Sequence, residues 1–281
     1  MLSDEQKAHF RVLGFLKVPG ALTPQEVDEY SWRFDKIIEA GETQGDESDN
    51  GARIFPNGHR VIIPLIEADP YFYNMLDHPN LASIAEDLMG EDCIFFGCSD
   101  GQIHNGDTNW HRDLAQRLLH GGDTDWDSDV DSPGPAIEAK LTFYLDDVAP
   151  GKGCLSFIPG SHLWPRHFRD IEKQPDQDVL GYSTPDIPGR FDLAADKGDV
   201  IAFHTRILHS SWGGGENRRQ MAWMMRTAPR TQSEIDSIAE FNKGYAEKWS
   251  RKTGRLISDR LFETADSRRM KKIQHLKASG A

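Results

Sequence analysis

The chain of 281 residues carries 32 lysines and arginines against 45 aspartates and glutamates, a formal net charge of −13 at pH 7. This acidic balance argues against nucleic acid and anionic membrane surfaces as partners, because phosphate groups are bound by basic surfaces. The three cysteines are too few and too irregularly spaced for a disulfide framework or a structural zinc module. No apolar run matches a secretion signal or a membrane span, so we expect a soluble, cytoplasmic protein that binds small molecules.

The N-terminal part of the chain predicts helices around one early strand. Thr23 supplies a helix cap, a proline follows at the first helical position, and a glutamate lies in the first turn. In chain order, the predicted elements are a helix over 4–12, a strand over 14–18, a helix over 24–40, an exposed loop over 41–50 and a helix over 80–89.

The middle of the chain predicts a mainly β fold with flanking helices. From Cys93 to about Thr227, short apolar runs alternate with Gly, Pro and Asp clusters, which is typical of a barrel or sandwich of β-strands. The stretch 121–135, with five aspartates, fits either a loop that covers the substrate or a solvated loop, and 165–192 could also border the pocket. Segments 231–245 and 257–276 predict surface helices that pack on the barrel or on a neighbouring subunit of a homo-oligomer.

The pair His111 and Asp113 is the most informative feature of the sequence. Residues two apart on an extended segment project to the same face, so both side chains can bind one metal ion. None of the other histidines among the eleven begins a His-x-Asp or His-x-Glu triplet. With a second, distant histidine, the pair would form the two-histidine, one-carboxylate facial triad, which leaves coordination positions of Fe(II) open.

His209 is the preferred third ligand, and His204 is its rival. Gly198 and Asp199 form a turn that opens an apolar run, which we interpret as one buried strand. Positions five apart fall on opposite faces of an uninterrupted strand, so at most one of the two histidines should face the metal unless a bulge intervenes. The alternative is that His111 and Asp113 form a hydrogen-bonded surface pair and that His209 is a core histidine.

Three stretches of the chain resemble the phytanoyl-CoA dioxygenase family of non-haem Fe(II), 2-oxoglutarate-dependent oxygenases. They are Trp110 to Leu114 with its His-x-Asp block, Leu145 to His162 with its turn and Pro-Gly-Ser-His segment, and Gly198 to Ser211 with its second histidine. The resemblance covers residues 8–228 and implies a double-stranded β-helix, or jelly-roll, cupin-like core. We expect one dioxygenase domain over 1–281, with a C-terminal helical extension from about 231 to 281.

The resemblance also implies a ligand set. The iron ligands would be His111, Asp113 and His209. An arginine shortly after His209 would pair with the distal carboxylate of 2-oxoglutarate, a task suited to a planar guanidinium with two parallel donors.

The co-substrate contacts are less tightly defined by the resemblance. Because the loop Trp212 to Gly215 looks like an insertion that shifts the register, Arg219 is favoured for the distal carboxylate, with Arg218 as the alternative. Counting back from the matched segment places Thr142 at a co-substrate contact, and Gln102 is a second candidate. The alternative for each of these four residues is an ordinary strand position that makes no contact with the co-substrate.

The activity that the resemblance implies is oxidative decarboxylation of 2-oxoglutarate by O2, giving succinate and CO2, with a hydroxyl group placed on an unactivated C–H of the substrate. The intact Asp113 argues against halogenation, because related halogenating enzymes carry a small residue there. We expect a small polar metabolite or natural-product intermediate as substrate. The two alternatives are a catalytically silent, metal-stabilised scaffold on the same fold and a zinc hydrolase.

Tryptophans surround the catalytic segments and have two interpretations. With the acidic stretch they could enclose an amine or aromatic group of the substrate, or they could belong to the barrel core. The five residues are Trp110, Trp126, Trp164, Trp212 and Trp223.

Overall fold

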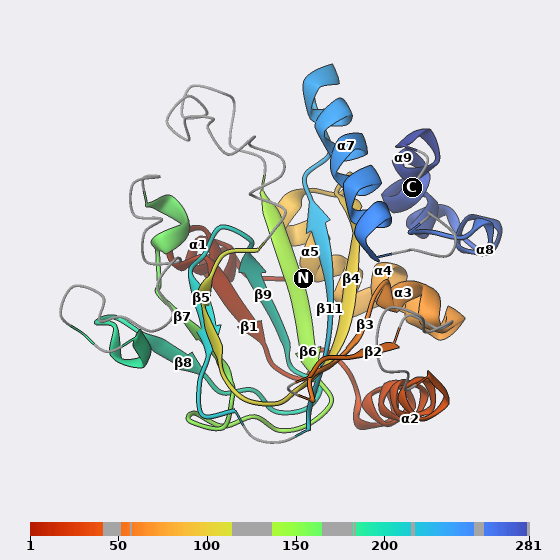
Figure 1. Cartoon of the computed structure of the whole chain (residues 1–281). Coiled ribbons are helices and arrows are strands. Elements are labelled where there is room, and N and C mark those ends of the chain that lie inside the picture. Colours follow the sequence, from red (N-terminus) through yellow and green to blue (C-terminus); the bar gives the residue numbers. More distant parts are fainter. Residues whose placement is uncertain are drawn as a thin grey trace.

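Two antiparallel β-sheets face one another in the computed structural model (Figure 1). The structure describes residues 1–41, 52–56, 58–113, 137–164, 182, 184–214, 217–249 and 256–279. The mainly β fold with flanking helices, expected from the sequence, is confirmed. The acidic stretch 121–135 with Trp126, residues 42–50 of the predicted loop and most of 165–192 lie outside the described residues, whereas Gly41 ends a helix.

The larger sheet has seven strands, and side chains on the inner face of its central strands line the interior of the site. In spatial order they are β1 (Phe15–Val18), β9 (Val200–His204), β6 (Glu138–Tyr144), β11 (Arg218–Arg226), β4 (Ile94–His104), β3 (Arg60–Ile62) and β2 (Ala52–Ile54).

The smaller sheet has four strands, in the order β5 (Thr108–His111), β10 (His209–Ser211), β7 (Leu155–Phe157) and β8 (Phe191–Leu193). Apolar side chains from both sheets meet between them. Tyr144 and Phe203 of the larger sheet and Phe157 of the smaller sheet belong to one buried cluster, and the Phe157 and Phe203 rings lie 5.5 Å apart. Burial of this apolar surface holds the two sheets together.

Helices cover the face of the larger sheet that is turned away from the smaller sheet (Figure 1). Phe34 of α2 and Leu65 of α3 approach this face so closely that a Cβ at Gly101 of β4 would lie 2.7 and 2.8 Å from their side chains. Helix α9 contacts β4 and α7, whereas α7 reaches the inner side of the sheet, where its Phe241 packs against Phe96 of β4.

The bounds of the helices are α1 (Asp4–Leu13), α2 (Pro24–Gly41), α3 (Leu65–Ala68), η1 (Pro70–Tyr73), α4 (Asn74–Asp77), α5 (Pro79–Met89), η3 (Ser161–Leu163), η5 (Thr184–Asp186), α7 (Gln232–Trp249), α8 (Asp259–Glu263) and α9 (Ser267–Ser279). The helices predicted over 4–12, 24–40 and 80–89 are therefore present. The segment 257–276, predicted to be helical, contains two helices, α8 and α9, with a turn between them. None of the described helices has the length and apolar character that crossing a membrane needs.

The interpretation of 198–209 as one strand is wrong. The chain forms β9 in the larger sheet, turns at Thr205–Leu208, and enters β10 in the smaller sheet. The amide of Ile207 donates to the His204 carbonyl at 2.9 Å, which closes this turn. His204 and His209 therefore belong to different sheets, and the alternation of one strand does not relate them.

Of the tryptophans named above, Trp110 and Trp223 are buried, and Trp164 and Trp212 are partly buried. Trp223 packs edge-on against Phe143 in the main core. Trp110, with Trp164 and Trp212 packed beside it, belongs to a smaller apolar cluster. These positions match the core interpretation of the tryptophans.

Candidate metal centre and active-site cavity

Strand pairing in the smaller sheet brings His111 and His209 together. Their Cα atoms are register partners across β5 and β10, and their ring centroids lie 4.2 Å apart. Asp113 follows β5, where its amide donates to the Thr205 carbonyl at 3.1 Å. The three side chains each offer one ligand atom, and these atoms all lie within 4.8 Å of one another.

Backbone carbonyls orient both imidazoles. Nδ1 of His111 lies 2.7 Å from the Asn109 carbonyl oxygen, and Nδ1 of His209 lies 3.0 Å from that of Ile207. A carbonyl oxygen only accepts hydrogen bonds, so each Nδ1 is the protonated nitrogen. In the neutral ring, Nε2 then carries the lone pair that binds a metal, and histidine ligands usually donate their other ring N–H to a carbonyl or carboxylate in this way.

The electrostatics of the cluster favour the protonation states in which Asp113 and His209 can bind a metal. Burial alone would raise the pKa of Asp113, but the charges of Lys140, His209 and His111 outweigh it and lower that pKa below its ordinary value. Burial, followed by the neighbouring His111, lowers the pKa of His209 to about 3. The carboxylate is thus anionic and the His209 imidazole neutral at physiological pH.

The donor set fits Fe(II). Oδ2 of Asp113 is buried and has no hydrogen-bond partner among the described residues, an arrangement that costs free energy unless a cation compensates it. Two imidazole nitrogens and one carboxylate oxygen on one side of an ion leave the other side open for further ligands.

His204 lies elsewhere. Its buried ring stacks 6.5 Å from the Phe10 ring and 5.3 Å from the His162 ring. The metal-binding group found in the described part of the chain contains His209 and not His204.

The two candidate arginines point to opposite faces of β11. Arg219 pairs with Asp146 at 2.6 Å and with Asp35 of α2 at 2.8 Å, on the helix-covered side of the sheet. Arg218 is buried on the inner side, where it donates to the Ser211 hydroxyl at 2.7 Å and lies 5.6 Å from the Tyr144 ring centroid. The structure therefore brings Arg218, and not Arg219, to the interior that the metal cluster also faces.

Thr142 and Gln102 also face the interior. Gln220 donates through Nε2 to the Thr142 hydroxyl at 2.8 Å, and that hydroxyl donates to the Met221 carbonyl at 3.0 Å. Gln102 donates to Oδ2 of Asp100 at 2.5 Å. These polar side chains occupy the middle of the larger sheet.

A cavity of about 580 Å³ opens beside the metal cluster. Its lining is mostly apolar and aromatic, with a few polar groups next to the candidate ligands. The lining residues are Phe55, Pro56, His59, Val61, Ile63, Cys98, Asp100, Gln102, His111, Arg112, Asp113, Lys140, Met224, Phe241, Tyr245 and Trp249.

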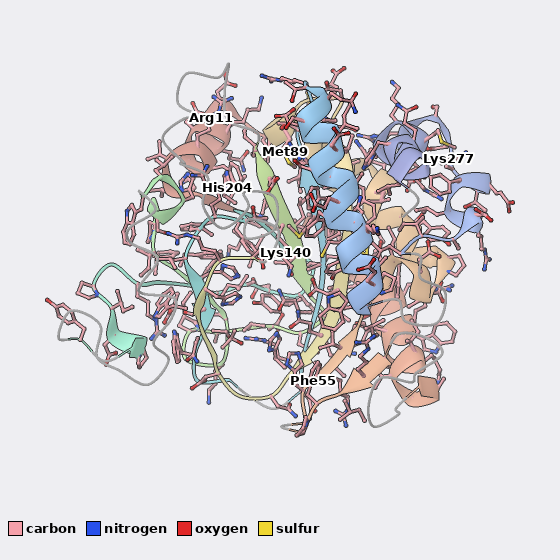
Figure 2. The ribbon with its side chains drawn as sticks, turned by 45° about the horizontal axis from the view of Figure 1, so that its top comes forward. Arg11, Phe55, Met89, Lys140, His204 and Lys277 are labelled. Atoms are coloured by element: carbon pink, nitrogen blue, oxygen red, sulfur yellow. The ribbon has the colours of Figure 1, made fainter. Side chains whose placement is uncertain are left out.

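Lys140 is a site residue that the sequence analysis missed. Its Nζ lies 2.9 Å from Oδ1 of Asp100 and 4.0 Å from Oδ1 of Asp113, beside helix α7 in Figure 2. Burial disfavours the charged amine, but the two carboxylates outweigh burial and raise the pKa of Lys140. A lysine in the middle of a buried β-strand was the available signal, because charged groups are rarely buried without partners.

The family model described as phytanoyl-CoA dioxygenase (PhyH) matches residues 10–220, most of the chain. The chain belongs to the phytanoyl-CoA dioxygenase family. The matched segment contains the three candidate metal ligands and both candidate arginines, and it ends before α7 begins.

Two curated relatives share this part of the chain. "Dioxygenase af480" of Aspergillus fumigatus is 25% identical over 212 residues, which is 74% of this chain and 60% of the relative. L-proline trans-4-hydroxylase of Streptomyces griseoviridis is 25% identical over 228 residues, 70% of this chain and 76% of the relative. The chain thus aligns with less than two thirds of the fungal protein.

Solved structures show the same fold. HygX from Streptomyces hygroscopicus, solved with nickel and 2-oxoglutarate, has a TM-score of 0.60 and 18% identity, covering 81% of this chain and 87% of HygX. The carbocyclase SnoK from nogalamycin biosynthesis has a TM-score of 0.58 and 21% identity, covering 81% and 85%. The jelly-roll expected from the resemblance is confirmed.

Proposed function

We propose that this protein is an Fe(II)- and 2-oxoglutarate-dependent dioxygenase that hydroxylates a small molecule. The observation that carries the proposal is the convergence of His111, Asp113 and His209, whose ligand atoms lie within 4.8 Å of one another on the interior of the fold. The family membership supports the same reaction class.

We place the distal carboxylate of 2-oxoglutarate at Arg218. Ser211, which accepts a hydrogen bond from Arg218, lies two residues after His209 on β10, so both side chains share one face of that strand. A dicarboxylate bound to the metal at His209 would therefore extend toward Arg218. The guanidinium supplies the parallel donors that a carboxylate accepts.

Arg219 is the weaker candidate because its donors are already used. Its Nε and both terminal nitrogens contact Asp146 or Asp35. Binding 2-oxoglutarate there would require breaking these ion pairs and crossing the sheet. The interior hydroxyl of Thr142, held by Gln220, and the amide of Gln102 are proposed to contact the co-substrate between the metal and Arg218.

When bound, iron supplies the oxidising chemistry: O2 and 2-oxoglutarate are converted to succinate and CO2 while one oxygen atom enters the substrate C–H bond. The chain's own residues hold the parts in place. The carbonyls of Asn109 and Ile207 fix the imidazole tautomers, and the buried sheet interior keeps water from the reacting groups.

Hydroxylation is proposed over other outcomes for two reasons. Asp113 occupies the carboxylate position, which leaves no ligand gap for chloride, and one curated relative is a proline hydroxylase. Carbocyclase and epimerase are named among proteins of similar fold, so product analysis has to accompany any activity assay. We also propose that the sheets and the C-terminal helices work as one domain, since α7 contributes to the cavity wall.

The test has two stages. Anaerobic addition of Fe(II) and 2-oxoglutarate to the protein should give a weak visible charge-transfer band, and His111→Ala should abolish it. A metabolite screen under O2 should then find substrate-dependent succinate with a product heavier by one oxygen atom. His78→Ala, which removes a histidine paired with Glu26 outside the cavity, is the control and should retain both signals. No band in the parent protein would overturn the proposal.

A further inference from the structure

The wall of the cavity includes aromatic residues from a part of the chain that the family model does not match. Phe241, Tyr245 and Trp249 recur every four residues on α7, so they share one face of that helix, and all three line the cavity. The matched segment ends at residue 220. The candidate metal ligands therefore lie within the segment that the family model matches, and the three aromatic residues of the wall lie after it.

The aromatic residues are fixed in place. The Phe241 ring lies 4.5 Å from Phe96 of β4 and 5.6 Å from Tyr245, and the Tyr245 ring lies 6.2 Å from Trp249. Phe241 and Tyr245 are 3% and 7% exposed. Phe241 and Tyr245 are stacked and Trp249 is tilted against them, so the three packed rings give the cavity an aromatic wall, which favours a ligand with a ring system over a flexible chain.

Lys140 is one of the polar residues that line the same cavity. An ammonium group carries three donors, and its contact with Oδ1 of Asp100 uses one of them. Its Nζ also lies 4.0 Å from Oδ1 of the candidate ligand Asp113, so a group bound to Lys140 is held next to the metal cluster.

Away from the metal cluster, the described lining of the cavity offers no uncommitted carboxylate to a cationic substrate. Asp100 contacts Lys140 through Oδ1 and accepts from Gln102 through Oδ2, so both of its oxygens are occupied. Val61, Ile63 and Met224 add further apolar lining. A small polar amino acid would leave this apolar surface uncovered, and a volume of about 580 Å³ is within the range of sites for drug-sized ligands.

Strand register separates Lys140 and Met224 of this cavity from the proposed co-substrate position at Arg218. Along β11, Arg218 pairs with His104 of β4 at one end, while Met224 pairs with Lys140 of β6 toward the other. The 2-oxoglutarate proposed at Arg218 and a ligand at Lys140 would therefore occupy different ends of the interior.

We propose that the primary substrate is a largely apolar, ring-containing molecule that packs its ring against Phe241 and Tyr245 and presents a carbonyl or other oxygen acceptor to Lys140. This assignment rests on the proposed function and narrows its substrate class. Phe241 and Tyr245 set the selectivity for rings, and Lys140 positions the molecule beside the metal cluster. The amine and polar-metabolite classes expected from the sequence give way to this class.

Binding of simple probes to the metal-free full chain tests the proposal without requiring turnover. The ring probe is 2-acetylnaphthalene, and 2-decanone presents the same ketone on a flexible chain. Ligand-observed NMR titration should give an affinity for 2-acetylnaphthalene at least roughly tenfold above that for 2-decanone, because a rigid ring loses less conformational freedom on binding.

Variants identify the contacts. Tyr245→Ala and the charge-matched double variant Lys140→Met with Asp100→Asn should each weaken 2-acetylnaphthalene binding roughly tenfold, the size expected for one aromatic contact or one charged hydrogen bond. Tyr245→Phe keeps the ring and should bind within about twofold of the parent. Ile235→Ala changes an exposed residue of the same helix and is the matched control. Thermal unfolding establishes that each variant is folded.

Equal affinities for the two probes would overturn the proposal, as would unchanged binding in folded Tyr245→Ala and in the folded double variant. If Tyr245→Ala does not fold, the Tyr245→Phe and double-variant titrations still decide the matter, since the double variant must weaken binding while Tyr245→Phe must not. The oxygenase proposal fails separately, through the absence of the charge-transfer band in the iron-loaded protein.

Discussion

Arg218 donates to the Ser211 hydroxyl across 2.7 Å, which ties the inner face of β11 to the strand that carries His209. The next residue, Arg219, faces the other side of the sheet and pairs with Asp146 and Asp35. Substitutions of the two neighbouring arginines are therefore expected to differ in their effect on 2-oxoglutarate binding.

Arg218→Met should raise the KM for 2-oxoglutarate roughly a hundredfold, because truncating one partner of a buried charge pair costs several kcal/mol. Arg219→Met should leave that KM within about twofold and lower the free energy of unfolding by about 1 kcal/mol or less, since its ion pairs are partly exposed. Succinate assays over a range of 2-oxoglutarate concentrations, with urea unfolding, check both. The reverse pattern would assign the co-substrate to Arg219.

Gly153 should affect the same contact. A Cβ at this residue would lie 2.6 Å from Nη1 of Arg218, and the residue has a φ of +83°. Gly153→Ala should therefore displace the guanidinium and raise the KM for 2-oxoglutarate about tenfold. Gly151→Ala is the control, because Gly151 has a φ of +68° and a Cβ there meets nothing within 4 Å. Both variants should lose about 1 kcal/mol of stability from backbone strain, but only the first should change the KM.

Substitutions of His204 and His209, on either side of the turn between β9 and β10, should distinguish the histidine that binds metal from the one that packs in the core. His209→Ala should weaken Fe(II) binding a hundredfold or more, on the order expected for loss of a ligand. His204→Ala should leave Fe(II) affinity unchanged and lower the free energy of unfolding by about 1–3 kcal/mol, because it empties a buried site between Phe10 and His162. Anaerobic competition with a chromophoric chelator measures the affinities. Loss of iron binding in folded His204→Ala would contradict the ligand assignment.

His275 of α9 should contribute to acid sensitivity. Burial lowers its pKa from 6.5 to about 4, so the folded state holds it neutral while the unfolded chain protonates it. Its contribution to stability is fully present above pH 6.5 and declines as the pH falls toward 4, by about 3 kcal/mol at most. His275→Gln should flatten the loss of unfolding free energy over this window. Parallel pH curves for the parent and the variant would show that the His275 pKa is not lowered by folding.

Local sequence patterns predicted the parts of the site that depend on neighbouring residues. The alternation of an extended segment places His111 and Asp113 on one face, and the helix cap at Thr23 marks the start of α2. The apolar run after Gly198 and Asp199 made His209 the preferred third ligand, the resemblance implied the same residue, and the structure brings it to the same cluster.

The features that sequence could not predict depend on where the chain changes sheets. The turn between β9 and β10 breaks the alternation that would relate His204 to His209. The face of β11 occupied by Arg218 depends on register with β4 and β6, and the residues between Trp212 and β11 obscure that register. The place of α7 at the cavity depends on packing between segments far apart in the chain.

The position of α7 has an evolutionary consequence. In the proposed arrangement, the metal ligands and Lys140 lie within the shared family core, while the aromatic residues that select for a ring lie on the C-terminal helix α7. Mutations in α7 are therefore free to retarget the enzyme without disturbing the metal ligands. Grafting a different helix onto residues 232–249 is then a direct route to new substrate preferences on an unchanged catalytic scaffold.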